Sequence, residues 1–235
     1  MKKPWKELPN CPGCSVSEIN IFKNLNKEER EFLNREKNCN SYLKGDIIYH
    51  EGNRITGCYC VNSGILKIYK TGIEGKEQII AFAQKGDIIG YRSILSNEPA
   101  CTTAQVIDDA LLCYLPTDVL LSLVKSNSAF SLDLMQLTCK ELNQANMYIK
   151  DIAQKTVRER LAEVLLMLRN NFGEDQESFL QIILTREDLA NIVGTATESV
   201  IRLLSEFKSD SLIELSNKKI KLKNISALKK IANDI

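Results

Sequence analysis

The 235-residue sequence lacks the features that mark membrane and secreted proteins. It has no uninterrupted apolar run of about 18 residues, so no membrane span is predicted. Its first residues are basic, but they lack the apolar core of about 7 residues that a secretory signal peptide needs. From these two absences we predict a cytoplasmic protein without a membrane partner.

Catalytic signatures are also missing. The only histidine is His50, and cupin-like metal enzymes generally need two or three histidines with a carboxylate. The sequence has no phosphate-binding loop, no dinucleotide-binding fingerprint and no evident nucleophile–base pair. We therefore predict that the protein is not an enzyme and has no catalytic residues. A cupin-like enzyme or ligand-binding protein is the alternative from another class.

A strong charge of either sign is absent, since the formal net charge is +1 at pH 7. This balance excludes no partner, because a DNA-binding protein needs only a local basic patch. The hydrophobic fraction of 44% and the charged fraction of 26% are typical of globular proteins. The length allows one large domain or two modest ones.

Cysteine, by contrast, is abundant, with eight residues. In a reducing compartment cysteines favour metal binding or redox chemistry over structural disulfides. Cys11 and Cys14 form a CxxC motif in NCPGCSVSEIN, near the start of the chain. Two thiolates on a flexible tail can reach one metal site. The motif alone does not distinguish an iron–sulfur cluster from a zinc site or a thiol redox switch.

Residues from about 39 to 115 predict β-structure. Runs such as DIIYHEG, GCYCVNSGILKIYK and ALLCYLP are short and rich in β-branched and aromatic residues, and glycines separate them. Short strands with glycine turns are typical of an all-β sandwich or barrel. TGIEGKEQ is expected to form a hairpin tip.

After Pro116 the pattern becomes helical. A helix over residues 128–153 would be about 38 Å long and would carry a narrow apolar seam at heptad spacing. The predicted seam consists of Phe130, Leu134, Leu137, Leu142, Ala145, Ile149 and Ile152. A narrow stripe on a long helix favours pairing with the same helix of a second copy, so we predict a homodimer. Packing within one chain is the alternative.

The segment LTREDLANIVGTATESVIRLLSEFKSDSLIELSNKKIKL predicts two short helices joined at Gly194 and a two-strand hairpin. This is a helix-turn-helix followed by a wing. Thr185 with Asp188, and Thr195 with Glu198, match capping boxes at the two helix starts.

In a helix-turn-helix the second helix enters the major groove of DNA. The residues expected to reach base edges are Thr197, Glu198, Ser199 and Arg202. Glutamate can accept a hydrogen bond from cytosine, and arginine can bind guanine with two. Thr185, Arg186 and the wing lysines are expected at phosphates. Two alternatives remain: Glu198 completes a helix cap, or it forms a surface ion pair with Arg202.

LTREDLANIVGTATESVIRLL resembles the winged helix-turn-helix of the CRP/FNR family of bacterial transcription regulators. LKGDIIYHEG, VNSGILKIYK, GKEQIIAFAQKGDIIG and VRERLAEVLLML resemble that family's effector barrel and interdomain segment, so the resemblance covers nearly the whole chain. It implies an α+β protein with a cyclic-nucleotide-binding-like β jelly-roll barrel, a long dimerisation helix and a C-terminal winged helix-turn-helix. The domains expected are a cysteine-containing tail with short helices (1–38), the barrel (39–126), the dimerisation helix (127–154) and the DNA-binding domain (155–235).

The same resemblance implies a transcription regulator that binds a palindromic promoter operator in double-stranded DNA and contacts RNA polymerase. Glu198 and Arg202 match the family's base-reading glutamate and arginine. Thr197 and Ile201 differ from the residues that the family usually has there, so the operator sequence beyond a TGA-like core is left open.

The cyclic-nucleotide branch of the family binds its ligand through residues that correspond to GYRSILSNEPACTTA. Gly90, Thr102 and Thr103 match this set. Tyr91 stands in place of the glutamate that bonds the ribose, and Cys101 in place of the arginine that neutralises the phosphate. A buried phosphate without a cationic partner is costly, so we predict that cyclic AMP is not the effector.

The oxygen-sensing branch binds a [4Fe–4S] cluster through tail cysteines and one cysteine in the last barrel strand. By resemblance, Cys11 and Cys14 match the tail and Cys113 matches the strand, whereas Asn20 replaces the third tail cysteine. The resemblance also implies that the first and last strands are neighbours, so Cys39 is the predicted fourth ligand. The alternative is a zinc or thiol redox site, or an unidentified small-molecule effector in the barrel.

The other cysteines have simpler expected roles. Cys58 and Cys60 share one strand face and are expected to pack as small apolar residues. They become rival ligands if that face points toward the tail. Cys139 is expected in the helix seam, and His50 is interpreted as a surface residue rather than a haem ligand.

Overall fold

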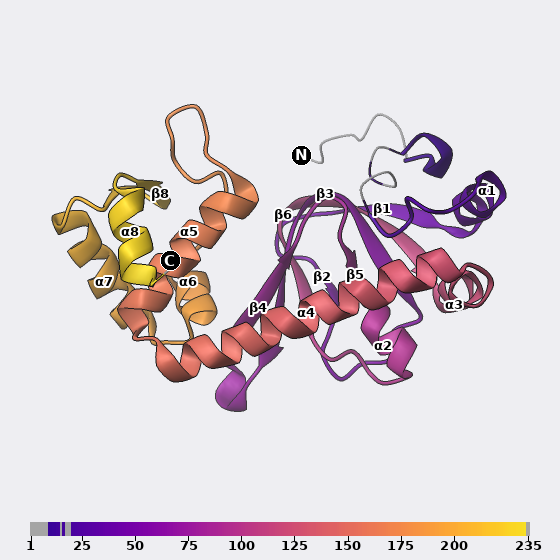
Figure 1. Cartoon of the computed structure of the whole chain (residues 1–235), viewed down its shortest axis with the longest axis horizontal. Helices are drawn as coiled ribbons and strands as arrows, with labels where there is room; N and C mark the ends of the chain where they lie inside the picture. Colours follow the sequence, from indigo (N-terminus) through magenta and orange to yellow (C-terminus); the bar gives the residue numbers. More distant parts are fainter. Residues whose placement is uncertain (1–8, 15, 17–19, 234–235) are drawn as a thin grey trace. The chain divides into compact units, whose positions relative to one another are not determined.

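The computed structural model of the chain describes residues 9–14, 16 and 20–233. They form two compact units, Met1–Asn143 and Gln144–Ile235, whose elements are labelled in Figure 1. The two units are referred to below as the N-terminal and C-terminal units. In the described part of the chain, no helix is both long and apolar enough to cross a membrane.

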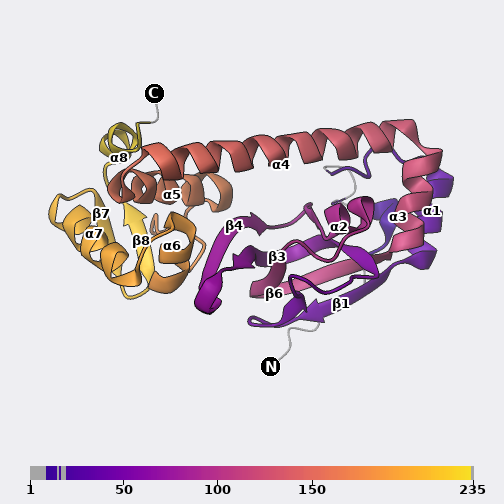
Figure 2. The same ribbon diagram turned by 90° about the horizontal axis from the view of Figure 1, so that it is seen from below.

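A six-stranded antiparallel sheet forms the centre of the N-terminal unit. Its strands are β1 (Asn38–Tyr42), β2 (Ile47–Tyr49), β3 (Gly57–Thr71), β4 (Glu77–Ala83), β5 (Ile88–Ile89) and β6 (Thr103–Pro116). The main order is β1-β6-β3-β4, as Figure 2 shows from below. Strand β2 pairs with β6, and β5 pairs with β3. The first strand therefore lies beside the last.

A bulge bends the two longest strands. The register between β3 and β6 shifts around Ser63 and Ile65, and Gly64 has a φ of +87°. A Cβ on Gly64 would lie 2.5 Å from Ala110 Cα. Only glycine fits a positive φ and such a close backbone approach, so Gly64 permits the curvature of the barrel-like sheet.

Helices cover one end of this sheet (Figure 1). They are the short turn η1 (Cys11–Gly13), α1 (Lys27–Glu36), α2 (Tyr91–Ser96), α3 (Thr117–Ser126) and the start of α4 (Ser128–Gln154). Phe130 and Leu134 of α4 are 0% and 2% exposed in the core of this unit, and Phe130 stacks on Phe22 at 5.7 Å. Leu137 packs against the same core. The prediction that these three residues extend the dimer seam is therefore wrong.

A different face of α4 exposes an apolar stripe. Its residues are Leu132, Met135, Cys139, Leu142, Ala145, Ile149 and Ile152, and all seven are exposed. They recur at steps of three and four, which places them on one side of the helix. From Leu142 onward the predicted seam residues lie on this exposed stripe, and upstream the stripe continues through Cys139, as predicted, and through Met135 and Leu132. Pairing of the stripe with a second copy stays a prediction.

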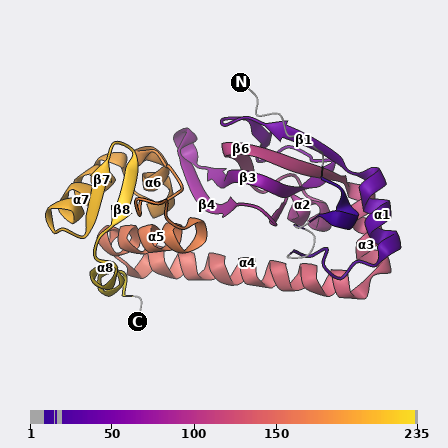
Figure 3. The same ribbon diagram turned by 90° about the horizontal axis from the view of Figure 1, so that it is seen from above.

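The C-terminal unit is a winged helix-turn-helix (Figure 3). Its elements are α5 (Val157–Phe172), α6 (Arg186–Val193), α7 (Thr197–Ser209), β7 (Ile213–Ser216), β8 (Lys219–Leu222) and α8 (Ile225–Ala232). The antiparallel pair β7–β8 is the expected wing. Helix α8 is an addition to the predicted elements, and it packs on α5 through a face that buries Leu228 and Ala232.

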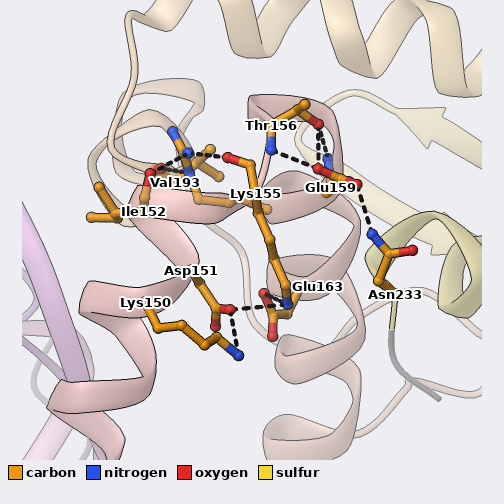
Figure 4. A network of polar contacts seen from close by, with 10 residues as sticks. Lys150, Asp151, Ile152, Lys155, Thr156, Glu159, Glu163, Val193 and Asn233 are labelled. Atoms are coloured by element: carbon orange, nitrogen blue, oxygen red, sulfur yellow. Dashed lines mark hydrogen bonds and ion pairs between the residues drawn. The ribbon is translucent and has the colours of Figure 1, made fainter.

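Polar contacts fasten the turn between α4 and α5 (Figure 4). Lys155 Nζ lies 3.3 Å from Asp151 Oδ1 and 2.8 Å from Glu163 Oε2. Thr156 and Glu159 form the capping box of α5, and Asn233 Nδ2 donates to Glu159 Oε1 at 2.7 Å. Lys155 thus joins Asp151 of α4 to Glu163 of α5, and Asn233 joins the end of α8 to the first turn of α5.

Arg160 joins the same corner to the helix-turn-helix. Its Nε donates to the carbonyl oxygen of Val193 at the end of α6 at 2.9 Å, and its Nη1 donates to that of Lys155 at 2.7 Å. Tyr148 Oη, on α4, donates to the carbonyl oxygen of Ile192 at 3.1 Å. The C-terminal part of α4 is therefore hydrogen-bonded to the last turn of α6.

Candidate functional site

Three cysteines form a row across the sheet of the N-terminal unit. Cys39 on β1 lies opposite Cys113 on β6, and Cys60 on β3 lies opposite Cys113 on its other side. Residues directly opposite on antiparallel strands point to the same face of a sheet. All three thiols therefore face the same way, and the sulfur atoms of Cys39 and Cys113 are 2.6 Å apart.

The N-terminal tail carries its CxxC motif to this row. The backbone N–H of Cys11 donates to Asn34 Oδ1 at 3.0 Å, and Asn62 Nδ2, on β3, donates to Cys14 Sγ at 3.7 Å. A cavity of about 40 Å³ lies between the tail and the sheet, and Cys11, Cys14, Cys60 and Cys113 all line it. Together with Cys39 they are called the thiol site below.

The surroundings of the thiol site are mostly apolar. The polar side chains that line the cavity beside the thiols are Asn20, Arg30, Lys37 and Asn62. Val16, Phe22, Leu33 and Leu115 line the cavity beside the thiols. Burial raises the pKa of both Cys11 and Cys60, because a thiolate is poorly solvated there. A metal centre compensates this penalty by binding the thiolate directly.

Cys39 and Cys113 have opposite pKa shifts. The hydrogen bond from the Cys113 thiol lowers the pKa of Cys39 to about 7, and the Lys37 ammonium acts in the same direction. The same hydrogen bond raises the pKa of Cys113, which is the donor. Within this pair, Cys39 is the thiol that ionises first.

The donor set fits an iron–sulfur cluster. Among residues 9–14, 16 and 20–233, no three histidine, cysteine or acidic side chains lie close enough together to hold a single metal ion. A [4Fe–4S] cluster has a different requirement, since each of its four cysteine thiolates binds its own iron atom. Four thiols that line one largely apolar cavity, with Cys39 beside Cys113, satisfy that number and type of ligand.

The structure brings the four predicted metal ligands into one place, and it adds Cys60. Sequence reasoning named Cys60 only as a rival, because the direction of its strand face could not be read from the sequence. Cys58, two residues away, is 0% exposed in the core. Cys101, Cys139 and His50 are exposed, and none of them lines the cavity.

Two neighbouring residues of GYRSILSNEPACTTA, Tyr91 and Arg92, are held by contacts within the N-terminal unit. Tyr91 is 1% exposed and belongs to the core of the N-terminal unit. Arg92 Nε lies 3.3 Å from Glu141 Oε2. The guanidinium of Arg92 thus has a carboxylate partner within its own unit.

The turn of the helix-turn-helix differs in detail from the prediction. Gly194 ends α6 in the left-handed region, with φ +71°, and the backbone N–H groups of Gly194 and Thr195 donate to the carbonyl oxygen of Ala190 at 2.9 and 3.1 Å. Because Thr195 belongs to this turn, α7 begins two residues later, with Ala196 as its N-cap and no side-chain cap. The predicted capping box of Thr195 and Glu198 is wrong.

The four base-reading candidates lie on the first turns of α7, and Glu198 and Arg202 are exposed. Arg202 Nη1 is 2.5 Å from Glu206 Oε1, and Glu206 Oε2 is 3.1 Å from Arg158 Nη1. The alternative of an Arg202–Glu198 pair is therefore wrong: Arg202 pairs one turn further along the helix. The Glu198 carboxylate, in the first turn of α7, therefore forms no ion pair within the described residues.

The two predicted phosphate contacts at the start of α6 differ in their surroundings. Thr185 is the N-cap of α6, and its hydroxyl donates to Asp188 Oδ2 at 2.6 Å. This capping box is confirmed. Arg186 is half-buried, and its Nη1 is buried with no hydrogen-bond partner. Burial lowers the pKa of Arg186, and an anion at this place would satisfy its guanidinium.

Most wing lysines already have partners. Lys219 Nζ is 2.8 Å from Asp175 Oδ2, Lys221 Nζ donates to the carbonyl oxygen of Glu177 at 2.9 Å, and Lys223 Nζ is 3.7 Å from Glu214 Oε2. Lys218, at the tip, has no ion pair or hydrogen bond in the described part of the chain. The wing therefore presents fewer unneutralised charges than its sequence indicates.

Comparison with known proteins identifies both units. The family model of the cyclic nucleotide-binding domain matches residues 39–127, and that of the Crp-like helix-turn-helix domain matches residues 159–231. The fumarate and nitrate reduction regulatory protein of Yersinia pestis is 29% identical over 230 residues, which cover 96% of this chain and 91% of that protein. The protein of the same name from Escherichia coli K12 is 28% identical and covers 95% and 90%.

Solved structures share the fold. A regulator of the CRP/FNR family from Eubacterium rectale has a TM-score of 0.76 at 22% identity, with 91% of this chain and 97% of that chain covered. FixK2 from Bradyrhizobium japonicum has a TM-score of 0.74 at 25% identity, with 83% and 96% covered. With both of its units matched and its relatives aligned along almost their full length, the chain belongs to the CRP/FNR family of DNA-binding transcription regulators.

Proposed function

We propose that this regulator responds to oxygen, nitric oxide or redox state through a [4Fe–4S] cluster bound at the thiol site. The observation that carries the proposal is the gathering of five of the eight cysteines where the tail meets the sheet. When bound, such a cluster supplies an oxygen-labile and nitric-oxide-labile bond between the tail and the sheet. The thiolates we assign are Cys11, Cys14 and Cys113, with Cys39 or Cys60 as the fourth.

The chain's own residues provide a route from this site to DNA. Cys113 lies three residues before Pro116, where β6 ends and α3 begins. Helix α3 leads directly into α4, whose exposed stripe we assign to a second copy of the chain. Anchoring the tail on β6 therefore acts on the strand that leads into the dimerisation segment, 127–154, although the compact units divide within that segment.

In the dimer, α7 of each protomer enters the major groove, and the two helices read half-sites about 34 Å apart on a palindromic operator. Thr197, Glu198, Ser199 and Arg202 contact bases, whereas Thr185 and Arg186 are placed at phosphates. RNA polymerase is the further partner that we assign to the DNA-bound dimer. The buried Tyr91 and the paired Arg92 support an effector other than cyclic AMP.

The test is to purify the protein without oxygen and assay iron and acid-labile sulfide. We expect a broad absorption band near ~400 nm that bleaches in air, together with a change in DNA affinity on bleaching. The variant Cys113→Ser should lose the band, whereas Cys101→Ser, at an exposed cysteine outside the cavity, should keep it. Colourless protein with one zinc per chain would establish the zinc alternative instead.

A further inference from the structure

The thiol site holds five cysteines, one more than a four-thiolate centre uses, and their positions are not equivalent. Cys60 lines the cavity together with Cys11, Cys14 and Cys113, whereas Cys39 does not. Cys39 lies on the other side of β6, where its sulfur contacts that of Cys113 at 2.6 Å. The two candidates for the fourth ligand thus flank Cys113, with only one of them on the cavity.

The tail is bonded to the strand that carries Cys60. Asn62, two residues after Cys60 on β3, donates to Cys14 Sγ at 3.7 Å. Asn20, on the tail, donates through Nδ2 to Cys60 Sγ at 3.5 Å. The first contact holds the CxxC segment over β3, and the second holds Asn20 of the tail beside the Cys60 sulfur.

We propose that Cys60, and not Cys39, completes the ligand set Cys11, Cys14, Cys60 and Cys113. This assignment rests on the proposed cluster. In it, Cys39 remains a hydrogen-bond partner of Cys113 outside the ligand set. Cys60 is 8% exposed, and a thiolate buried among apolar groups is stabilised by bonding to iron rather than by water.

Two variants that each keep four cysteines test the choice directly. Both carry Cys58→Ala, Cys101→Ser and Cys139→Ser. The Cys60-retaining variant adds Cys39→Ser, and the Cys39-retaining variant adds Cys60→Ser. Each is purified without oxygen, and iron, sulfide and the band near ~400 nm are measured per chain beside the wild type. Circular dichroism and thermal unfolding report folding independently of the cluster.

We expect wild-type iron and sulfide in the Cys60-retaining variant. We expect at least about tenfold less in the Cys39-retaining variant, because loss of an outer-shell partner alone costs a metal site that much. Adding Asn20→Cys to the Cys39-retaining variant should restore the cluster, because Asn20 reaches the Cys60 sulfur. If the Cys39-retaining variant does not fold, the iron and sulfide content of the Cys60-retaining variant alone tests the assignment.

Equal cluster content in the two variants, or loss in the Cys60-retaining one while it is folded, overturns the assignment. The single variant Cys39→Ser makes the same distinction if Cys58→Ala destabilises the fold. Failure of the proposed function is a separate result: the wild type itself would then contain no iron or sulfide, and the ligand assignment would fall with it.

Discussion

At the scale of single residues, ion pairs modify the roles that the sequence indicates. Arg202 is exposed, yet it is not unconstrained, because Glu206 pairs with it and with Arg158. An exposed pair of this kind contributes little to stability, but it orients the guanidinium before DNA arrives. Its importance is therefore expected in binding and not in folding.

We expect Arg202→Ala to weaken binding to the preferred operator by about 10- to 100-fold, the range for one lost bidentate base contact. The operator can be selected from random duplexes and the affinity measured by fluorescence anisotropy. Discrimination should relax at one base pair per half-site. Arg169→Ala is the matched control, since Arg169 pairs with Glu174 far along the sequence from α7. A uniform loss over all sequences would contradict base reading.

Glu51 provides a pH-dependent contribution to stability. The Lys70 ammonium at 2.5 Å and the Thr71 N–H lower the pKa of the Glu51 carboxyl. A lowered folded-state pKa stabilises the protein above the unfolded value of about 4.3 and loses this effect as the pH falls through the folded value. Urea unfolding should thus show wild type more stable than Glu51→Gln at pH 7, and the difference should shrink in acid. A constant difference would refute this.

The cysteines show how much of the thiol site can be predicted from the sequence. The spacing of Cys11 and Cys14, and the family resemblance at Cys113 and Cys39, identify four members of the thiol site. Cys60 could not be chosen, because β3 is largely buried and its alternation does not tell which face meets the tail. That choice depends on long-range contacts such as Asn20 with Cys60.

At the scale of elements, local signals predict helix starts only where no neighbouring turn competes for the same residue. The capping box of Thr185 and Asp188 forms as predicted. That of Thr195 and Glu198 does not, because the backbone of Thr195 serves the turn after α6. Likewise, helical spacing places Phe130 on an apolar face but does not say which partner covers it.

The Thr185 cap gives a direct measure of this effect. Thr185→Ala should destabilise the protein by about 1 kcal/mol, the usual cost of losing an N-cap, which lowers Tm by roughly 2–4 °C for a chain of this size. Thr197→Ala should have a much smaller effect, since Thr197 makes no cap at the start of α7. Calorimetry compares the two. Equal shifts would mean that the cap bond contributes nothing.

The ion pairs and hydrogen bonds of the wing lysines predict that these lysines contribute unequally to DNA binding. Lys218→Ala should reduce the slope of log K against log salt by about 1 per protomer, as expected for one lost phosphate contact. Lys219→Ala should change it less, because Asp175 already neutralises Lys219. Titrations at several salt concentrations measure both slopes, and a larger change for Lys219 would reverse this assignment.

At the scale of the whole molecule, we assign the exposed stripe of α4 to the dimer interface. Ile149 is 65% exposed and Leu142 is 61% exposed, which is unusual for a regular apolar seam unless a partner covers it. In its second half the predicted seam is exposed, because nothing in the described part of the chain covers those residues. Upstream, the core of the N-terminal unit takes Phe130 and Leu134 instead.

We expect Ile149→Glu to convert the dimer to a monomer, because it places a charge in the apolar seam. Light scattering after size exclusion measures the mass, and operator affinity should fall with it. Gln144→Glu is the control, since position 144 is exposed and lies about 200° around the helix from Leu142 at about 100° per residue. A dimer that survives Ile149→Glu would place the interface elsewhere.

The hydrogen bonds of Arg160 and Tyr148 to the end of α6 have a genetic consequence. They make the last eleven residues of α4 part of the body that holds the helix-turn-helix. Substitutions there should be inherited as changes in promoter choice or promoter affinity. In a screen for variants whose activity no longer depends on the effector, mutations should accumulate before residue 144. Mutations after residue 144 should instead change promoter choice or promoter affinity.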